Sequence, residues 1–129
     1  MKILICGNLG YVGPGVCKHL KMIFPESEIT GLDTGYFSSR ISQFGRIGDT
    51  YCDTQIYKDI RDVKEDFFVG FDAIVVLSAI SNDPMGNKFE KVTNEINYLA
   101  VKKLIESFVT LPNKRLIFAS SCSMYGSSD

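Results

Sequence analysis

The feature that most constrains the fold is a turn with three glycines, Gly7, Gly10 and Gly13, between two apolar segments of different period. Residues 2–6 form a short, nearly continuous apolar run, which is typical of a strand buried on both faces of a parallel sheet. In residues 11–24 the apolar side chains recur at the spacing of an amphipathic helix. The sequence therefore predicts a strand, a glycine turn and a helix in direct succession.

The spacing of these glycines suits a turn that carries a dinucleotide. The first glycine permits the tight turn out of the strand, the second lets the backbone approach a pyrophosphate, and the third lets the helix pack near the sheet. The helix then directs its N-terminal N–H groups and the positive end of its dipole toward negative charge. A Walker phosphate loop is excluded, because no Gly-Lys-Ser/Thr sequence follows the glycines.

An acid in the expected place supports this interpretation. Asp33 ends the second predicted strand, about 20 residues beyond the turn. Its carboxylate can accept hydrogen bonds from the hydroxyls of an adenosine ribose and would repel a 2′-phosphate. The sequence therefore favours NAD over NADP as the cofactor. The plainer alternative is an ordinary turn at the end of a strand.

The rest of the chain alternates between strand and helix patterns. Further strands are expected at residues 28–32, 55–58, 72–77 and 116–119, a long helix at residues 89–109, and a loop at residues 34–50. Such alternation implies a parallel sheet with right-handed crossovers. The predicted fold is α/β, a three-layer Rossmann-type doubly wound parallel sheet that is truncated after about the fifth strand.

Composition argues against several other classes of protein. The 129 residues fit one domain, and the net charge of −1 includes no basic stripe for nucleic acid and no basic amphipathic stretch for a membrane surface. No run approaches the roughly 20 apolar residues that span a bilayer. The four cysteines are scattered and His19 is interpreted as a helix-surface residue, so no metal site or disulfide framework is expected. A reduced, cytoplasmic protein is the simple interpretation.

Four later segments carry a resemblance to a known family. They are Asp59-Ile60-Arg61-Asp62, Val76-Leu77-Ser78-Ala79, Asn97 within Glu95-Ile96-Asn97-Tyr98, and residues 118–126 (FASSCSMYG). With glycines spaced G-x-x-G-x-x-G, they resemble the extended short-chain dehydrogenase/reductases, the NAD-dependent sugar-nucleotide epimerases and dehydratases. The corresponding family segments are D-[IVL]-[RT]-D, H-L-A-A, V-N and F-x-S-S-x-x-V-Y-G. Val76 replaces the usual histidine of the second, a tolerable departure because that contact is largely through the backbone.

The resemblance implies NAD as the cofactor and assigns residues to it. Asp59 would hold the adenine amino group, Ile60 would pack on the ring, and the backbone of residues 77–79 would pass along the cofactor. The full expected set is Gly7, Asn8, Leu9, Gly10, Tyr11, Val12, Gly13, Asp33, Asp59, Ile60, Leu77, Ser78, Ala79, Asn97 and Ser120. Plainer alternatives stay open: Asp59 as a solvated loop acid, and Asn97 as a surface residue or as an internal tie between its helix and a neighbouring strand.

The resemblance also implies a reaction. NAD would remove a hydride from a sugar carbon while a tyrosine takes the hydroxyl proton, and the hydride would return after epimerisation or elimination. By motif position Ser121 would orient the sugar hydroxyl. Contacts to the nucleotide-sugar substrate are expected from Ser81, Asn82, Ser121, Cys122 and Ser123. The plainer alternatives are a connecting loop at residues 81–85 and, for Ser120 and Ser121, a serine pair that merely ends a strand.

The tyrosine and its lysine partner are expected beyond Asp129. The chain is therefore interpreted as an NAD-binding Rossmann domain, residues 1–129, without the catalytic Tyr-Lys helix and substrate domain, and inactive alone. Tyr98 and Lys102 have the Y-x-x-x-K spacing, but they precede the serine strand and are not expected to be catalytic. Cys122 is interpreted as structural, because no base lies near it in sequence.

A second hypothesis comes from another class of protein. The chain would then be a non-catalytic dinucleotide-binding module that senses NAD or scaffolds a partner. Because relatives often pair through helices of this fold, a homodimer is left open. In either case the last predicted strand is expected to form an exposed, hydrophobic sheet edge.

Overall fold

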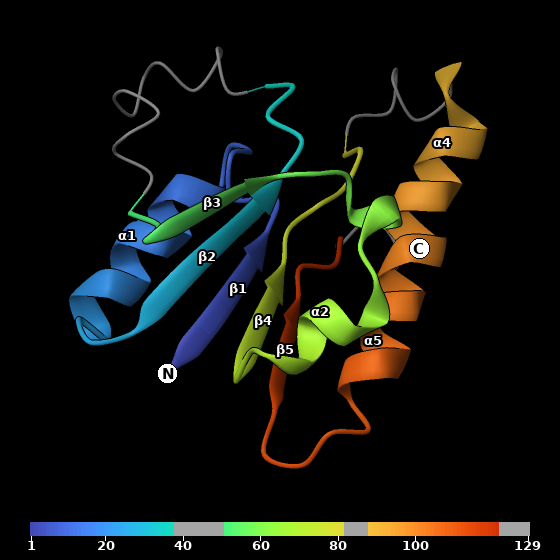
Figure 1. Ribbon diagram of the computed structural model, residues 1–129. Coiled ribbons are helices and arrows are strands. Elements are labelled where there is room, and N and C mark those ends of the chain that lie inside the picture. Colours follow the sequence, from blue (N-terminus) through green and yellow to red (C-terminus); the bar gives the residue numbers. More distant parts are fainter. Residues whose placement is uncertain (38–50, 82–87, 122–129) are drawn as a thin grey trace, which may run out of the picture.

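The sheet is the organising element of the computed structural model, which describes residues 1–37, 51–81 and 88–121 (Figure 1). Its five parallel strands lie in the order β3-β2-β1-β4-β5. They are β1 (Lys2–Cys6), β2 (Glu28–Asp33), β3 (Thr54–Tyr57), β4 (Ala73–Val76) and β5 (Arg115–Phe118). The chain runs outward from β1 to β3 on one side, then crosses back over the sheet to β4 and β5 on the other. The reversal falls between β1 and β4.

Helices cover both faces of this sheet. Helix α1 (Gly13–Ile23) packs on one face, and α2 (Glu65–Val69) and α5 (Val101–Phe108) pack on the other (Figure 1). Helix α5 continues from α4 (Glu90–Asn94) through η5 (Glu95–Ala100), in which the backbone hydrogen bonds are π-helical. A single 3-10 turn, η4 (Ile60–Asp62), follows β3. The expected three-layer α/β fold is confirmed.

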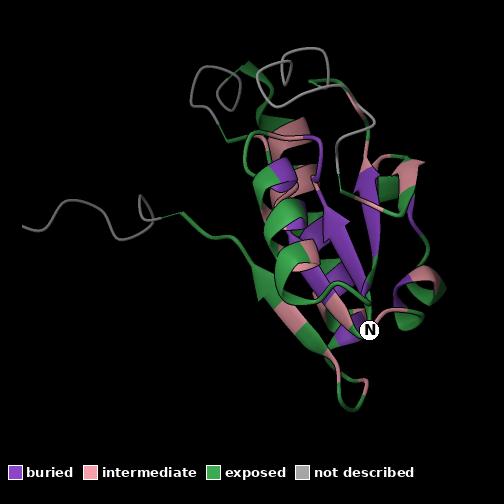
Figure 2. Ribbon diagram, turned by 90° about the vertical axis from the view of Figure 1, so that its left-hand side faces the viewer, coloured by how far each residue is buried: buried purple, intermediate pink, exposed green. Residues whose placement is uncertain are grey.

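The two cores meet at β1, whose alternate side chains point to opposite faces. Ile3 and Ile5 pack with Cys17 of α1, while Leu4 packs with Phe108 of α5, and all five side chains are no more than 2% exposed. Figure 2 shows this central part of the sheet as buried. A strand enclosed in this way needs apolar residues at consecutive positions, which explains the unbroken run after Lys2.

The expected strands agree with the observed ones to within about a residue at most ends, as is usual for element boundaries. Helix α1 begins at Gly13, later than expected, because the exposed Tyr11 and Val12 belong to the turn. The five-residue helix α2 was not expected, since it is too short to display a helical period. The predicted loop at residues 34–50 lies mostly outside the described residues.

Strand β5 pairs with β4 and leaves apolar side chains exposed. Ile117 is 61% exposed and Phe118 is 45% exposed, as expected for a hydrophobic sheet edge. In the part of the chain that the structure describes, no helix combines the length and the apolar character needed to cross a lipid bilayer.

Candidate cofactor site

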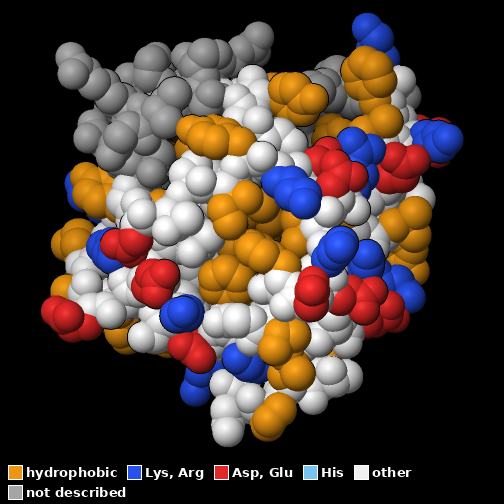
Figure 3. Space-filling view, in the orientation of Figure 1, with side chains coloured by type: hydrophobic (Ala, Val, Ile, Leu, Met, Phe, Trp, Pro, Cys, Tyr) orange, Lys and Arg blue, Asp and Glu red, His pale blue; other side chains and the backbone are white. Residues whose placement is uncertain are grey.

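A cleft of about 560 Å³ opens at the C-terminal edge of the sheet, where the strand order reverses. Open α/β sheets bind ligands at this point, and the volume lies within the roughly 300–1,000 Å³ of small-molecule sites. Hydrophobic side chains gather at the centre of the face seen in Figure 3. The cleft is lined by Gly7, Leu9, Gly10, Leu32, Asp33, Thr34, Tyr36, Phe37, Lys58, Asp59, Ile60, Arg61, Leu77, Ser78, Ala79, Ile80, Phe89, Val92 and Ile96.

The glycine turn forms one wall through its backbone. Gly7 has φ +85°, a left-handed conformation that glycine adopts without strain, and its N–H donates to the Leu32 carbonyl at 2.8 Å. A Cβ at Gly7 would lie 2.7 Å from the backbone nitrogen of Ser78, so a side chain is excluded. Gly10 donates to the Gly7 carbonyl at 3.1 Å. Bare backbone therefore faces the cleft here.

The Asn8 side chain supports this turn by packing against Gly31 of β2. Its fully buried side chain donates to Gln55 Oε1 at 2.6 Å, and Gln55 Nε2 donates back to Asn8 Oδ1 at 3.3 Å. It fills the space where a side chain at Gly31 would lie, and a Cβ at Gly13 would collide with the Asn8 backbone oxygen. Although Asn8 was expected among the cofactor-binding residues, its side chain lies under the turn and does not line the cleft.

Asp33 ends β2 with its carboxylate held on both sides. Oδ2 accepts a hydrogen bond from the Leu9 N–H at 3.1 Å, and Oδ1 accepts one from the Gly35 N–H at 2.8 Å. Each carboxylate oxygen has a second lone pair, which can accept from a ligand hydroxyl. The structure thus brings Asp33 to the cleft beside the glycine turn, as the sequence predicted.

Asp59 precedes η4 and is bound by one arginine. The Arg61 guanidinium donates to Asp59 Oδ1 at 3.0 Å through Nε and to Oδ2 at 2.8 Å, and the Arg61 N–H donates to Oδ1 at 2.9 Å. These bonds hold the pKa of the Asp59 carboxyl below its usual range. Arg61 Nη1 also donates to Glu95 Oε2 at 2.8 Å, and the pKa of the guanidinium is raised by both carboxylates, Asp59 first.

The segment after β4 forms the opposite wall. Leu77 donates to the Cys6 carbonyl at 2.8 Å, and Ser78 and Ala79 follow it along the cleft. Asn97 accepts from the Ile80 N–H at 2.8 Å and donates to the Ile80 carbonyl at 2.9 Å. This is the internal tie that the sequence left open, because it fixes the π-helical segment η5 against the wall without placing Asn97 among the lining residues.

Some expected site residues lie elsewhere. Tyr11 and Val12, 82% and 56% exposed, do not line the cleft, nor do the exposed residues Ser81, Ser120 and Ser121. Asn82, Cys122 and Ser123 lie outside the described residues.

The Tyr98–Lys102 pair has no part in the cleft lining either. Tyr98 is 56% exposed, and Lys102 forms an ion pair with Glu106 at 2.7 Å, which raises the Lys102 pKa. Neither Tyr98 nor Lys102 lines the cleft.

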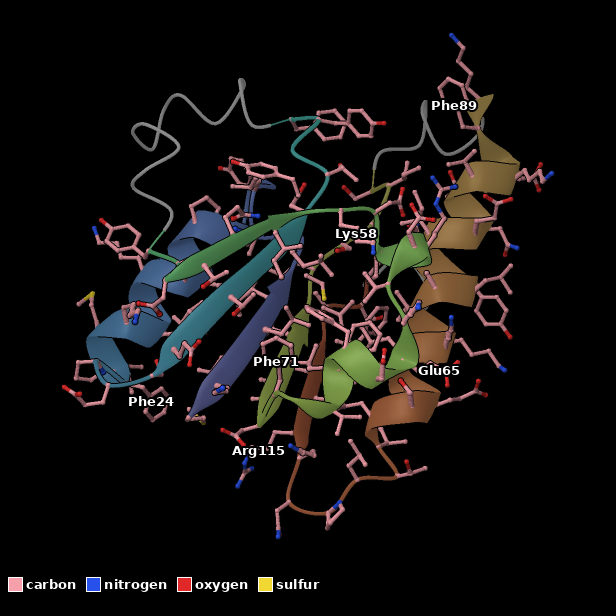
Figure 4. The ribbon with its side chains drawn as sticks, viewed as in Figure 1. Phe24, Lys58, Glu65, Phe71, Phe89 and Arg115 are labelled. Atoms are coloured by element: carbon pink, nitrogen blue, oxygen red, sulfur yellow. The ribbon has the colours of Figure 1, made fainter. Side chains whose placement is uncertain are left out.

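Several lining residues were not anticipated from the sequence. Phe89, Val92 and Ile96 lie three and four residues apart, the spacing of a single helix face, which is a signal that could have revealed them. Tyr36 and Phe37 follow Asp33 without any periodic signal. Figure 4 shows Phe89 at the start of α4, and Lys58 at the end of β3 on the path to η4.

Two thiols meet beneath the site. The Sγ atoms of Cys17 and Cys52 are 3.6 Å apart, a contact the scattered sequence positions did not suggest, and it raises the pKa of Cys17 together with burial. Burial and the nearby Asp33 carboxylate raise the pKa of the Cys6 thiol to about 12. Protonated thiols of this kind are poor nucleophiles.

These features define a dinucleotide-binding α/β domain. The residues fit NAD, because Gly7 and Gly10 leave backbone without side chains in the cleft and the Asp33 carboxylate stands at the end of β2. The sequence matches the NAD dependent epimerase/dehydratase family over residues 3–129. The chain belongs to this family, and its cofactor is NAD.

Solved structures share the whole fold of the chain. Pal from Bacillus thuringiensis is 25% identical with a TM-score of 0.79, over 100% of this chain and 42% of that one. The UDP-glucose-4-epimerase of Stenotrophomonas maltophila, with bound NAD, is 23% identical with a TM-score of 0.78, over 100% of this chain and 39% of that one. The ADP-L-glycero-D-manno-heptose-6-epimerase of Helicobacter pylori is 26% identical with a TM-score of 0.76, over 99% and 41%.

The chain spans about two fifths of the length of these three structures. No curated protein gives a significant match to it.

Proposed function

We propose that residues 1–129 are the NAD-binding domain of a sugar-nucleotide epimerase or dehydratase. One observation carries this proposal: a single cleft is lined by the glycine turn, Asp33, Asp59 with Ile60, and the segment 77–79. These groups follow β1, β2, β3 and β4, and they meet because parallel strands present their C-terminal ends at one edge.

Each group has a part in binding the cofactor. The backbone of the glycine turn and the start of α1 would hold the diphosphate, since they offer N–H groups and the positive end of a helix dipole. The Asp33 carboxylate would accept hydrogen bonds from the adenosine ribose and repel a 2′-phosphate. Asp59 would accept from the adenine amino group, with Ile60 against the ring. NAD, when bound, supplies a site that takes a hydride from a sugar carbon and returns it.

The substrate would lie beyond the ends of β4 and β5. Ser81 follows β4 and Ser121 follows β5, and Ser121 would donate to or accept from the reacting sugar hydroxyl and so orient it. Two of the similar solved structures are epimerases of a UDP-sugar and an ADP-sugar, which supports nucleotide sugars as the substrate class. Pairing as a homodimer and a cytoplasmic location stay predictions.

Titration calorimetry of the 129-residue protein with NAD and with NADP tests the cofactor part. We expect NAD to bind at least about tenfold more tightly than NADP. Repulsion of about 1.4 kcal/mol between the Asp33 carboxylate and a 2′-phosphate corresponds to that factor. Tighter binding of NADP, or no binding of either dinucleotide, would contradict the proposal.

Activity is tested on the protein expressed from its complete reading frame, with UDP- and ADP-sugars as substrates and NMR of the sugar as the readout. Ser121→Ala should lower kcat by about a hundredfold, because loss of orientation of the reacting hydroxyl costs on that order. Ser107→Ala, at a helix serine bonded to the Leu104 carbonyl, serves as the control. Full activity of the Ser121→Ala variant would show that Ser121 does not orient the reacting hydroxyl.

A further inference from the structure

Three charged groups bonded in a row, Asp59, Arg61 and Glu95, stand on the η4 side of the cleft. The proposed function puts the adenine base there, and this side is called the base end of the cleft. Asp59 and Arg61 line the cleft, and Glu95 lies behind Arg61 without lining it. These three side chains join the turn η4 to the helical segment η5, since Arg61 bonds to Glu95 across 34 positions of sequence. The side chains of Arg61 and Glu95 are only 35% and 34% exposed, so both ends of this bond are partly shielded from water.

The hydrogen bonds fix which polar groups face the cleft. Nε and one Nη2 donor of Arg61 are directed at Asp59, and an Nη1 donor is directed at Glu95. The guanidinium is planar, so bonds to one carboxylate on each of two sides also fix the orientation of its plane. Asp59, paired with a cation, stays an ionised carboxylate and can only accept hydrogen bonds.

We propose that Glu95 is a positioning residue that, through Arg61, makes the base end of the cleft select adenine over a 6-oxopurine. The inference rests on the proposed NAD site. Adenine presents an amino group at carbon 6, which can donate to the Asp59 carboxylate. Hypoxanthine presents a carbonyl oxygen at the same place, which would face an acceptor and lose its hydrogen bond with water.

Glu95 is needed for this selectivity because it occupies Arg61. Without the Glu95 carboxylate, Nη1 loses its partner and the guanidinium is held on one side only. It can then turn toward the cleft and donate to a base carbonyl, while its hold on Asp59 loosens. The preference for adenine should fall even though Glu95 itself touches no ligand.

The experiment compares the Kd of NAD with that of nicotinamide hypoxanthine dinucleotide, by calorimetry on the 129-residue protein. The unmodified protein should prefer NAD by about tenfold or more, the usual scale for a hydrogen bond to a charged group. Glu95→Ala and Arg61→Lys should each reduce this ratio at least about threefold. Glu95→Gln keeps an acceptor oxygen for Nη1 and should retain more of the ratio than Glu95→Ala.

Glu106→Ala is the matched control, since it removes an exposed ion pair with Lys102 from the same continuous helix. It should leave the ratio unchanged. If Glu95→Ala and Arg61→Lys still bind NAD and show the same ratio of the two Kd values as the unmodified protein, this inference is wrong, while the proposed function still stands. Failure of the unmodified protein to bind either dinucleotide would instead overturn the proposed function. If Glu95→Ala does not fold, as seen by circular dichroism, Glu95→Gln and Arg61→Lys decide the question.

Discussion

The carboxylate of Asp33 accepts a hydrogen bond from the backbone N–H of Leu9 at 3.1 Å, across 24 positions of sequence. The bond joins the end of β2 to the glycine turn after β1. Because Gly35 holds the other carboxylate oxygen at 2.8 Å, Asp33 has a fixed orientation before any ligand arrives. Groups that are oriented in advance lose less conformational freedom when they bind.

Asp33→Asn should weaken NAD binding and relax the choice between NAD and NADP. The amide keeps the size of the carboxylate but removes the charge-assisted bonds to the ribose and the repulsion of a 2′-phosphate. We expect a loss of about tenfold to a hundredfold in NAD affinity and a smaller loss, or a gain, for NADP. Calorimetry with both dinucleotides measures this. An unchanged ratio of the two Kd values would argue against Asp33 at the ribose.

Two glycines in α1 should respond oppositely to alanine. A Cβ at Gly13 would collide with the backbone of Asn8, whereas a Cβ at Gly15 would meet nothing within 4 Å. Gly13→Ala should therefore lower the free energy of unfolding by about 1–3 kcal/mol. Gly15→Ala should raise it by about 0.5–1 kcal/mol, because alanine favours helix. Urea unfolding of both variants measures the difference, and equal effects would contradict the packing of α1 on the turn.

The Asn8–Gln55 pair should behave as one unit. Asn8→Ala removes the donor to Gln55 Oε1 and opens a cavity under the turn, so it should cost about 2–4 kcal/mol of unfolding free energy. A double-mutant cycle with Gln55→Ala should give a coupling of about 1 kcal/mol or more. Additive effects in the cycle would mean that the two side chains act independently.

Acid should weaken the fold through Asp53 as well as Asp59. Asp53 accepts hydrogen bonds from Lys21 Nζ at 2.8 Å and from the Ile29 N–H at 2.6 Å, which lower its pKa in the folded state. A lowered folded-state pKa stabilises the protein above the unfolded pKa, about 3.9, and this stabilisation is lost as the pH falls further.

Asp53→Asn should therefore be less stable than the unmodified protein at pH 7, with a gap that closes on acidification below about pH 4. Urea midpoints measured across this range test the expectation. Glu26→Gln changes an exposed acid in the turn before β2 and should match the unmodified protein throughout. A gap of constant size at every pH would show that Asp53 acts other than by its charge.

Much of this architecture follows from short-range patterns. The apolar run of β1 and the glycines that follow it predict a buried strand and a turn, because each depends on the covalent preferences of neighbouring residues. The position of Asp33 follows from the same pattern, since parallel strands bring their ends to one edge. The doubly wound sheet and the NAD cofactor could both be predicted from these local patterns.

The supporting contacts could not be predicted because they depend on side-chain direction in three dimensions. Asn8 lies in the turn motif, yet its amide points beneath β2 to meet Gln55, 47 positions away. Arg61 belongs to a recognised segment, but its bond to Glu95 crosses from η4 to η5. No spacing along the chain encodes such pairs, since the crossovers between strands set which side chains meet.

The strands differ in how deeply they are buried, and this difference determines which of them should unfold locally. β1 is hydrogen-bonded to a strand on each side and has Leu4 and Ile5 fully buried, whereas β5 carries Ile117 at 61% exposure. Amide hydrogens in β1 should exchange with deuterium only on global unfolding, while those of β5 should exchange by local fraying. The sheet should therefore loosen at its edge strands, β3 and β5, before its centre, where β1 should keep its protection longest.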